Sequence, residues 1–152
     1  MWIVKQFDEL SVYQLYEIYQ LRVAVFVVEQ ECAYQEVDEL DLDAIHLFQK
    51  EGDNITAYAR LVPEADQVRL GRVIVHPQFR GQQKGHALLE KAIAIAADRY
   101  PMLPMIAGAQ AHLQKFYEAF DFRTVSDVYL EDDIPHVDMI RTQTREEGGN
   151  LD

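Results

Sequence analysis

The order of apolar and polar residues at the start of the chain predicts a strand, a helix and then an irregular segment. Residues 2–7 alternate well enough for a first strand. Ser11 is a suitable N-cap for a helix whose apolar residues recur at helical spacing between Val12 and Phe26. Residues 29–43 are acidic and have little period, so we expect a loop or a short helix there.

The rest of the chain continues this alternation of strands and helices. Gly52-Asp53-Asn54 lies between two apolar stretches and is typical of a hairpin turn. The apolar face of the segment after Gly85 indicates a helix that ends before Pro101. The predicted elements are strands at 45–49, 55–62, 68–75, 105–109, 122–130 and 137–141, with helices after Gly85 and at 112–120. This order predicts an α/β fold, a mixed (α+β) sheet with helices on its faces.

The length of the chain, 152 residues, is close to the usual size of one domain. The sequence contains no repeat, no low-complexity segment and no interdomain linker. We therefore expect a single domain over residues 1–142, followed by a polar, Gly-rich tail over residues 143–152.

The formal net charge is 14 − 26 = −12, which argues against partners that are bound through Lys and Arg. Nucleic acid and anionic membrane surfaces are therefore not expected as partners. An acidic protein would attract a cationic substrate such as an amine, although solubility alone also explains the acidity.

Cysteine usage and the first residues indicate a cytoplasmic protein. Cys32 is the single cysteine, so no internal disulfide framework exists, and its acidic neighbours disfavour a nucleophilic thiolate. The N-terminus lacks the apolar core of a signal peptide, and no apolar run approaches the ~20 residues that span a bilayer. No zinc motif and no G-x-S-x-G hydrolase motif occurs, so no metal is expected.

The segment from Val73 to Ala87 joins a predicted strand to a predicted helix through a loop that contains Gly81 and Gly85. The first turn of a helix leaves four N–H groups without partners, and the helix dipole adds about half a positive charge there. A pyrophosphate fits such a site. Glycines let the backbone approach closely, and Arg80 and Lys84 add charge for phosphate oxygens.

Other phosphate-binding motifs do not match this loop. The pattern G-x-x-x-x-G-K-[ST] is absent because Lys84 precedes its glycine, and G-x-G-x-x-G is absent because Gly81 and Gly85 are four apart. The alternative to a phosphate site is that the two glycines only form a turn.

The loop resembles that of the GNAT superfamily of N-acetyltransferases, whose pattern Q/R-x-x-G-x-G/A is matched by residues 82–87. Residues 70–77 are similar to the family's preceding strand, and residues 112–122 to its late helix, which usually ends Y-E-x-x-G-F. The resemblance covers residues 1–142. Within the superfamily the chain resembles the ElaA-like group in segments 22–30, 109–112 and 134–139.

Three positions depart from the family pattern. Gln83 replaces a frequent glycine in the loop, and Gln110 stands where relatives often have Asn. Asp121 replaces the glycine before Phe122, although Asp tolerates the left-handed conformation better than most residues.

The resemblance implies that acetyl-CoA is the acyl donor and lies where two parallel strands splay apart. Backbone groups of the first strand would pair with the pantetheine arm, the loop N–H groups would hold the pyrophosphate, and Gln110 would position the pantetheine or thioester end. The implied binding residues are Val73, Ile74, Val75, Arg80, Gly81, Gln82, Gln83, Lys84, Gly85, His86 and Gln110.

The resemblance also implies the reaction, a direct attack of a neutral primary amine on the thioester carbonyl within one cleft. A strand N–H near Val75 would donate to the oxyanion. Tyr117, placed by the family match, would protonate the departing thiolate as general acid. Spacing alone favours a core aromatic at Tyr117, because it shares a helix face with Leu113 and Phe120.

An ammonium substrate must lose a proton before it attacks. The candidate bases are Glu29, Glu31, Asp41, His46, His112 and His136. Histidine has the most suitable unperturbed pKa. We favour the pair Glu29 and His136, because Glu29 follows an apolar run and His136 lies in a segment that resembles the ElaA-like group. Each histidine is alternatively a structural or surface residue.

Two other functions stay open. The segment from Arg22 to Phe26 also resembles acyl-homoserine lactone synthases, which share the fold but are usually longer. The second of these functions is that of a degenerate domain, which binds CoA but catalyses no reaction. The sequence does not identify the small-molecule amine, and a homodimer is expected only as the commonest closed assembly.

Overall fold

The computed structural model describes residues 1–143, so the predicted tail over residues 143–152 lies outside the described residues except for Gln143. Gln143 donates from Nε2 to the carbonyl of Leu103 at 2.6 Å. The strands are β1 (Trp2–Gln6), β2 (Ile45–Glu51), β3 (Asn54–Pro63), β4 (Val68–Val75), β5 (Met105–Gln110), β6 (Arg123–Thr124), β7 (Tyr129–Glu131) and β8 (Ile134–Arg141). The helices are α1 (Val12–Arg22), a π-helix (Val23–Glu29), α2 (Lys84–Arg99) and α3 (Gln114–Glu118), with 3-10 turns at Phe7–Glu9, Glu39–Leu42, Pro77–Phe79 and Ala111–Leu113.

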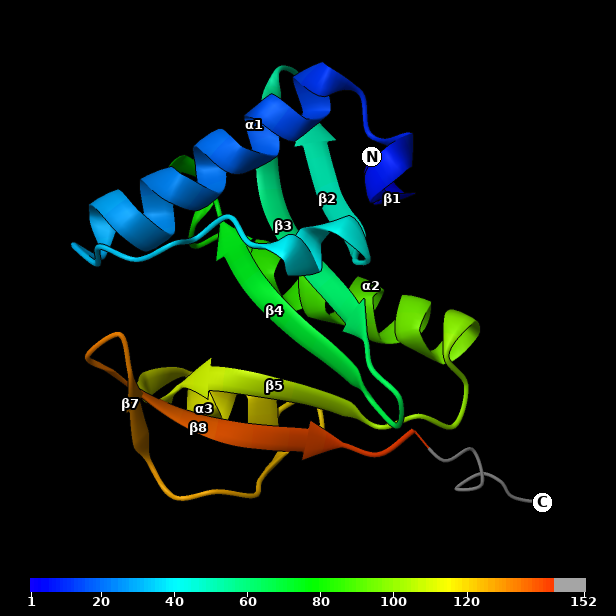
Figure 1. The fold of residues 1–152 in the computed structure, drawn as a ribbon, viewed down its shortest axis with the longest axis vertical. Helices are drawn as coiled ribbons and strands as arrows, with labels where there is room; N and C mark the ends of the chain where they lie inside the picture. The colour runs from blue at the N-terminus through cyan, green and yellow to red at the C-terminus, as the bar shows by residue number, and fades with distance from the viewer. Residues whose placement is uncertain (144–152) are drawn as a thin grey trace.

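The strands form one mixed sheet in the order β1-β2-β3-β4-β5-β8-β6, with β7 paired to β8 (Figure 1). β4 and β5 run parallel, and the remaining neighbours run antiparallel. Helices pack on both faces of this sheet. The predicted α/β fold with a mixed sheet is therefore confirmed.

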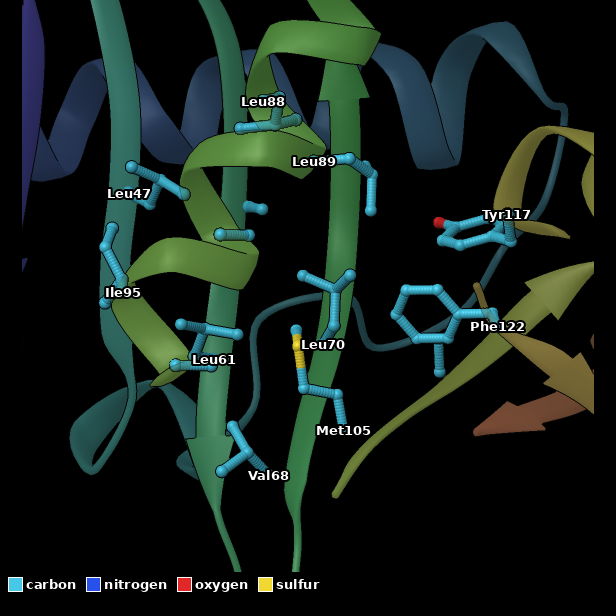
Figure 2. Packing of buried hydrophobic residues seen from close by; sticks show 14 of the residues in the cluster. Leu47, Leu61, Val68, Leu70, Leu88, Leu89, Ile95, Met105, Tyr117 and Phe122 are labelled. Atoms are coloured by element: carbon cyan, nitrogen blue, oxygen red, sulfur yellow. The ribbon is translucent and has the colours of Figure 1, made fainter. Parts of the chain in front are cut away.

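α2 covers one face of the sheet with the apolar stripe that its sequence predicts. Leu88 and Leu89 are fully buried and belong to the same core as Leu47, Leu61 and Leu70 of the strands beneath (Figure 2). A helix that repeats apolar residues every three or four positions buries one stripe and leaves the other side to solvent. Among residues 1–143, no helix combines the length and the apolar character needed to cross a membrane.

α1 covers the opposite face and begins where predicted. The Ser11 hydroxyl accepts a hydrogen bond from the Gln14 N–H at 3.0 Å, which confirms the N-cap. Ile18 and Leu21 then pack in a second core that contains Phe48 and Tyr58.

The end of this helix differs from the prediction. The sequence pattern predicts helical spacing as far as Phe26, but α1 ends at Arg22 and a π-helix follows. The N–H of Gln30 bonds the carbonyl of Val25 at 3.2 Å, and the N–H of Cys32 bonds that of Val27 at 3.0 Å, so each bond spans five residues. β-branched valines crowd a regular helix, which favours such a local widening.

The stretch predicted as one strand over residues 122–130 is divided into β6 and β7. Between them, the Ser126 hydroxyl accepts from the Asp138 N–H at 2.8 Å, and the Val125 N–H bonds the Asp138 carbonyl at 2.8 Å. A serine side chain that takes the place of a backbone partner interrupts a ladder.

β4 and β5 pair over a short length and then separate. Their register covers only Val68–Leu70 against Met105–Ala107, and the two ribbons diverge beyond this point (Figure 1). On the other side of β4, the register with β3 shifts at Arg72, which has a φ of +51°. Such a bulge bends a strand. The result is the splayed pair of parallel strands that the family resemblance implies.

Candidate functional site

The loop between β4 and α2 presents free backbone donors at the start of a long helix. α2 begins at Lys84 and runs for 16 residues, and its first bond back along the chain joins the Ala87 N–H to the Gln83 carbonyl at 3.1 Å. The N–H groups of Lys84, Gly85 and His86 therefore have no partner within the helix. They add to the positive end of the helix dipole.

The glycines of this loop have different roles. Gly81 has a φ of +83°, and a Cβ added there would meet nothing within 4 Å. Gly85 is an ordinary helical residue whose Cβ would lie 3.5 Å from Phe116 and 3.6 Å from Val75. The second left-handed position is Gln83, with a φ of +62°, so only Gly81 fulfils the expected need for positive φ.

The two predicted phosphate-binding cations are held by carboxylates. Arg80 donates to both oxygens of Glu29, at 2.7 and 2.9 Å, and Lys84 pairs with Glu51. Gln82 and His86 are exposed beside them. The Arg80–Glu29 pair is exposed, and such ion pairs contribute little to stability.

The edge of β4 offers backbone donors at the splay, the place beyond Leu70 and Ala107 where β4 and β5 separate. The His76 N–H bonds the Thr56 carbonyl of β3 at 2.8 Å, and successive residues of a strand point to opposite sides. Val75 therefore directs its N–H and carbonyl away from β3, as does Val73, whereas Ile74 faces β3. Arg80 Nε donates to that Val75 carbonyl at 3.2 Å, so the N–H groups of Val73 and Val75 are the donors left on this edge.

Tyr117 is held in place by the end of α3. The Phe122 N–H bonds the Tyr117 carbonyl at 3.3 Å and the Asp121 N–H bonds that of Glu118 at 3.0 Å. With Asp121 at a φ of +69°, this is a Schellman motif, and Asp121 does take the left-handed place of the family glycine. The Tyr117 and Phe122 rings pack edge to face with centroids 5.6 Å apart.

The Tyr117 ring is buried in the α2-side core, and its hydroxyl points from α3 toward β4 in Figure 2. Burial raises the pKa of the Tyr117 phenol. The phenol is therefore protonated at neutral pH and able to donate. The expectation of a core aromatic and that of an acid are both compatible with this position, because the ring packs in the core while the hydroxyl lies at its edge.

Gln110, at the end of β5, lies between the π-helix segment and β8. Its Nε2 donates to Oε1 of Gln30 at 3.4 Å, next to Glu29 at the end of the π-helix. On the other side, Gln110 faces His136 across the β5–β8 register. Gln110, Glu29 and His136 thus lie near one another where β4 and β5 end, although Glu29 itself is paired with Arg80.

His136 is buried and has one ring nitrogen available. Its side chain is among the buried polar groups, 8% exposed, and Nδ1 lies 2.7 Å from the Ile134 carbonyl. A carbonyl only accepts, so Nδ1 carries the hydrogen and Nε2 keeps its lone pair in the neutral ring. Nε2 has no hydrogen-bond partner within residues 1–143, which leaves it available as a base.

The other candidate bases lie elsewhere. Glu31 and His112 are exposed. His46 is fully buried, with Nδ1 2.7 Å from the Tyr58 hydroxyl and Nε2 2.9 Å from the Asp41 carbonyl. The Asp41 carboxylate is bound by two arginines, Arg22 and Arg60. Burial would raise the pKa of Asp41, but these arginines outweigh it and lower that pKa.

A buried ionic network surrounds Asp41, and the sequence analysis did not anticipate it. Arg22 donates to Glu36 at 2.8 Å as well as to Asp41, and Arg72 of the β4 bulge bonds the Glu36 carbonyl at 2.8 Å. The available signal was Arg22 itself, a charged residue that follows Leu21 on the apolar stripe of a predicted helix. The network ties the acidic segment 30–43 to the sheet.

The structure also has a cavity of about 640 Å³. It is bounded by α1, the β2–β3 turn and the residues that follow β4, and none of the predicted site residues lines it. Its mouth is formed by exposed α1 residues such as Tyr13 and Tyr16. The backbone donors, the helix start and Tyr117 all lie at the splay, so we place the candidate site there.

The residues at the splay fit a CoA-type acyl donor. Free N–H groups at the α2 start suit a diphosphate, the position of Gly81 leaves the loop surface open, and unpaired strand donors suit an amide-bearing arm. Within the described part of the chain, no group of three His, Cys, Asp or Glu side chains is arranged to hold a metal ion.

Comparison with known proteins places this fold and loop in a family. The family described as "Acetyltransferase (GNAT) domain" matches residues 11–143, and the chain belongs to the GNAT acetyltransferases. Protein ElaA of Escherichia coli K12 is 45% identical, over 92% of this chain and 95% of its own length. The crystal structure of E. coli ElaA has a TM-score of 0.90 over 93% of this chain and 99% of that one. The predicted resemblance to the ElaA-like group is confirmed.

Two further structures have the same fold. The crystal structure of an acyl-CoA N-acyltransferase from Pseudomonas aeruginosa is 44% identical, with a TM-score of 0.90 over 93% of this chain and 98% of that chain. A CoA-dependent acyl-homoserine lactone synthase, solved with isopentyl-CoA, has a TM-score of 0.82 over 100% of this chain and 93% of that chain, at 15% identity. This last likeness shows the fold alone.

Proposed function

We propose that this chain is an N-acyltransferase that moves an acetyl group from acetyl-CoA to a small primary amine, with both substrates bound at once. The proposal rests on three features that lie together where β4 and β5 separate. They are the start of α2 with its free N–H groups, the edge of β4 with the free Val75 N–H, and the buried hydroxyl of Tyr117. The GNAT family match supports it.

The residues that would hold the donor follow from these positions. The N–H groups of Lys84, Gly85 and His86, with Arg80 released from Glu29, would bind the diphosphate. The β4 edge over 73–75 would bind the pantetheine arm, and Gln110 would close the site from β5. When bound, the donor supplies a thioester that an amine can attack.

The chemistry divides between the two sides of the sheet. His136 Nε2 takes a proton from the ammonium form of the acceptor, and the neutral amine nitrogen then forms the new C–N bond as the C–S bond breaks. The nitrogen loses a second proton as it becomes an amide, and this proton, through solvent, restores the phenol of Tyr117. The Val75 N–H donates to the carbonyl oxygen. Tyr117 gives its phenolic proton to the departing sulfur. Glu29 is the second candidate base, and its pairing with Arg80 makes His136 the first.

The test is Tyr117→Phe, which keeps the ring and removes only the acid. We expect kcat to fall by roughly 100-fold or more, with an unchanged Kd for CoA by calorimetry. The matched control is Tyr100→Phe, since Tyr100 packs on the same core at the end of α2. Wild-type turnover by Tyr117→Phe, measured as thiol release, would remove Tyr117 from the mechanism.

The alternatives give different results in the same assays. A CoA-binding module would bind CoA and release no thiol with any amine. A relative of the acyl-homoserine lactone synthases would prefer longer acyl donors or acyl-carrier proteins over acetyl-CoA. A cytoplasmic location and a homodimer stay predictions, which fractionation and sedimentation would test.

A further inference from the structure

One face of the C-terminal half of the sheet is left open on the side where α1 lies. Ile106, Gly108 and Gln110 of β5 face Ile140, Asp138 and His136 of β8 in register. The residues between them, such as Val137 and Met139, point to the opposite face and are buried in the α2-side core. Gly108 on the open face is exposed, and it follows Ala107, where β4–β5 pairing ends.

Asp138 is fixed on this face by a tyrosine. The Tyr129 hydroxyl donates to Asp138 Oδ1 at 2.6 Å, while Oδ2 has no partner within residues 1–143. A Cβ on Gly108 would lie 3.2 Å from the Tyr129 hydroxyl and 3.8 Å from Oδ1. Burial and the neighbouring Asp138 raise the pKa of Tyr129, so the phenol stays a donor and holds the carboxylate with one oxygen free.

Asp138 and the proposed base, His136, lie close together on the same face of the sheet. His136 and Asp138 are two residues apart on β8, which places their Cα atoms about 7 Å apart. The Tyr129 ring spans both, because it stacks on His136 with centroids 6.0 Å apart while its hydroxyl reaches Asp138. A ligand that contacts one residue of this group is therefore within reach of the other.

The surroundings of this face are acidic. The turn between β7 and β8 carries Glu131, Asp132 and Asp133, and Cys32 Sγ donates to the Asp132 carbonyl at 3.6 Å, which brings the turn against the segment after the π-helix. Burial and both aspartates raise the pKa of Cys32. Two strand arginines also lie on this face: Arg69, which is paired with Glu64 at 2.9 Å, and Arg123 of β6, which is in register with Ile140. A positively charged ligand suits these charges.

We propose that the acceptor is a compact diamine, or an amine with a second positive group, whose reacting nitrogen lies at His136 and whose other ammonium is bound by Asp138 Oδ2. This inference rests on the proposed acetyltransferase function and names its substrate class. Tyr129 is a positioning residue that orients the carboxylate, and the missing side chain of Gly108 leaves room for the Tyr129 hydroxyl.

Binding tests the proposal without turnover. Backbone amide NMR of the full chain would be recorded during titration with 1,4-diaminobutane and with butylamine. We expect the diamine to shift the resonances of Gly108, Tyr129 and Asp138 and to bind more tightly than the monoamine. Asp138→Asn should weaken diamine binding by roughly 10-fold to 100-fold, the range for a lost hydrogen bond to a charged group, and leave the weak monoamine binding as it was.

Two variants separate recognition from structure. Asp127→Asn makes the same charge change at an exposed position just before β7 and should bind the diamine as wild type does. Tyr129→Phe keeps the carboxylate and should weaken diamine binding less than Asp138→Asn. Equal loss in Asp127→Asn, or diamine shifts that avoid Gly108 and Asp138, would overturn the proposal. Absence of CoA binding by calorimetry would instead remove the proposed function.

Discussion

Glu29 is a candidate base, and it also pairs with Arg80, a predicted phosphate-binding residue. Both carboxylate oxygens accept from Arg80, and this hydrogen bond lowers the pKa of Glu29, which weakens it as a base. The same contact occupies the arginine that the sequence assigns to the phosphates. If Arg80 binds the diphosphate as proposed, Glu29 competes with the diphosphate for this arginine.

Glu29→Gln should tighten CoA binding by about twofold to fivefold, because an exposed ion pair of up to about 1 kcal/mol no longer competes for Arg80. Calorimetric titration with CoA measures the change. Glu31→Gln is the control, since it removes the same charge from an exposed residue whose side chain bonds no loop residue within residues 1–143. An unchanged Kd together with a fall in kcat would instead identify Glu29 as the base.

The family resemblance, and not local spacing, singles out Tyr117 and His136 in the sequence. Spacing alone favours a core aromatic at Tyr117, and the roles of both residues stay predictions. Asp138 and Tyr129 were not found, because their meeting depends on the register of β8 with its neighbours. A sequence pattern shows that a strand exists but does not reveal which residues face each other across it.

At the scale of elements, the sequence predicts a strand correctly where its apolar pattern is strong. The prediction fails where a side chain interrupts the strand. The predicted strand 68–75 coincides with β4. The division of residues 122–130 depends on the Ser126 hydroxyl, a contact with β8 that local spacing does not reveal. The π-helix follows from the crowding of β-branched valines after Arg22, and apolar spacing alone does not distinguish it from a regular α-helix.

The loop before α2 has an unfavourable backbone position that can be tested. Gln83 adopts a φ of +62°, where a residue with a Cβ is disfavoured by roughly 1 kcal/mol. Gln83→Gly should raise the free energy of unfolding by up to about 1 kcal/mol, measured by urea denaturation. Gln82 is exposed and outside the left-handed region, so Gln82→Gly should lower it by about 0.5–1 kcal/mol. Equal effects of both changes would contradict the conformational argument.

At the scale of the molecule, the buried ionic network joins elements that are distant in the sequence. Arg22 at the end of α1 and Arg60 of β3 are both buried, and both bond the buried carboxylate of Asp41 in the acidic segment. Arg72 extends the network to the bulge of β4 that begins the splay. Removal of one partner from such a network leaves an uncompensated charge and costs about 3–5 kcal/mol. The segment 30–43, which begins next to Glu29, is thus anchored to the sheet by ion pairs.

The network also makes stability depend on pH in two steps. His46 accepts from the Tyr58 hydroxyl at Nδ1 and donates from Nε2 to the Asp41 carbonyl. Burial, with a smaller effect of Arg22 and Arg60, lowers the pKa of His46 below its ordinary value of 6.5. The unfolded chain therefore takes up a proton that the folded chain resists. The His46 contribution is complete above pH 6.5 and is lost as the pH falls below it.

The second step belongs to the carboxylates. Burial opposes ionisation of Asp38 and Asp41, but hydrogen bonds and charge from the arginines outweigh it and lower both pKa values below 3.8. Their contribution is present above pH 3.8 and is lost as the pH falls toward the folded pKa values. Urea denaturation between pH 8 and pH 3 should therefore give a free energy of unfolding that declines first below about pH 6.5 and again below about pH 4. His46→Gln keeps an N–H donor and an oxygen acceptor but does not titrate, so it should abolish the first decline and keep the second. A first decline that persists in His46→Gln would show that another group titrates there.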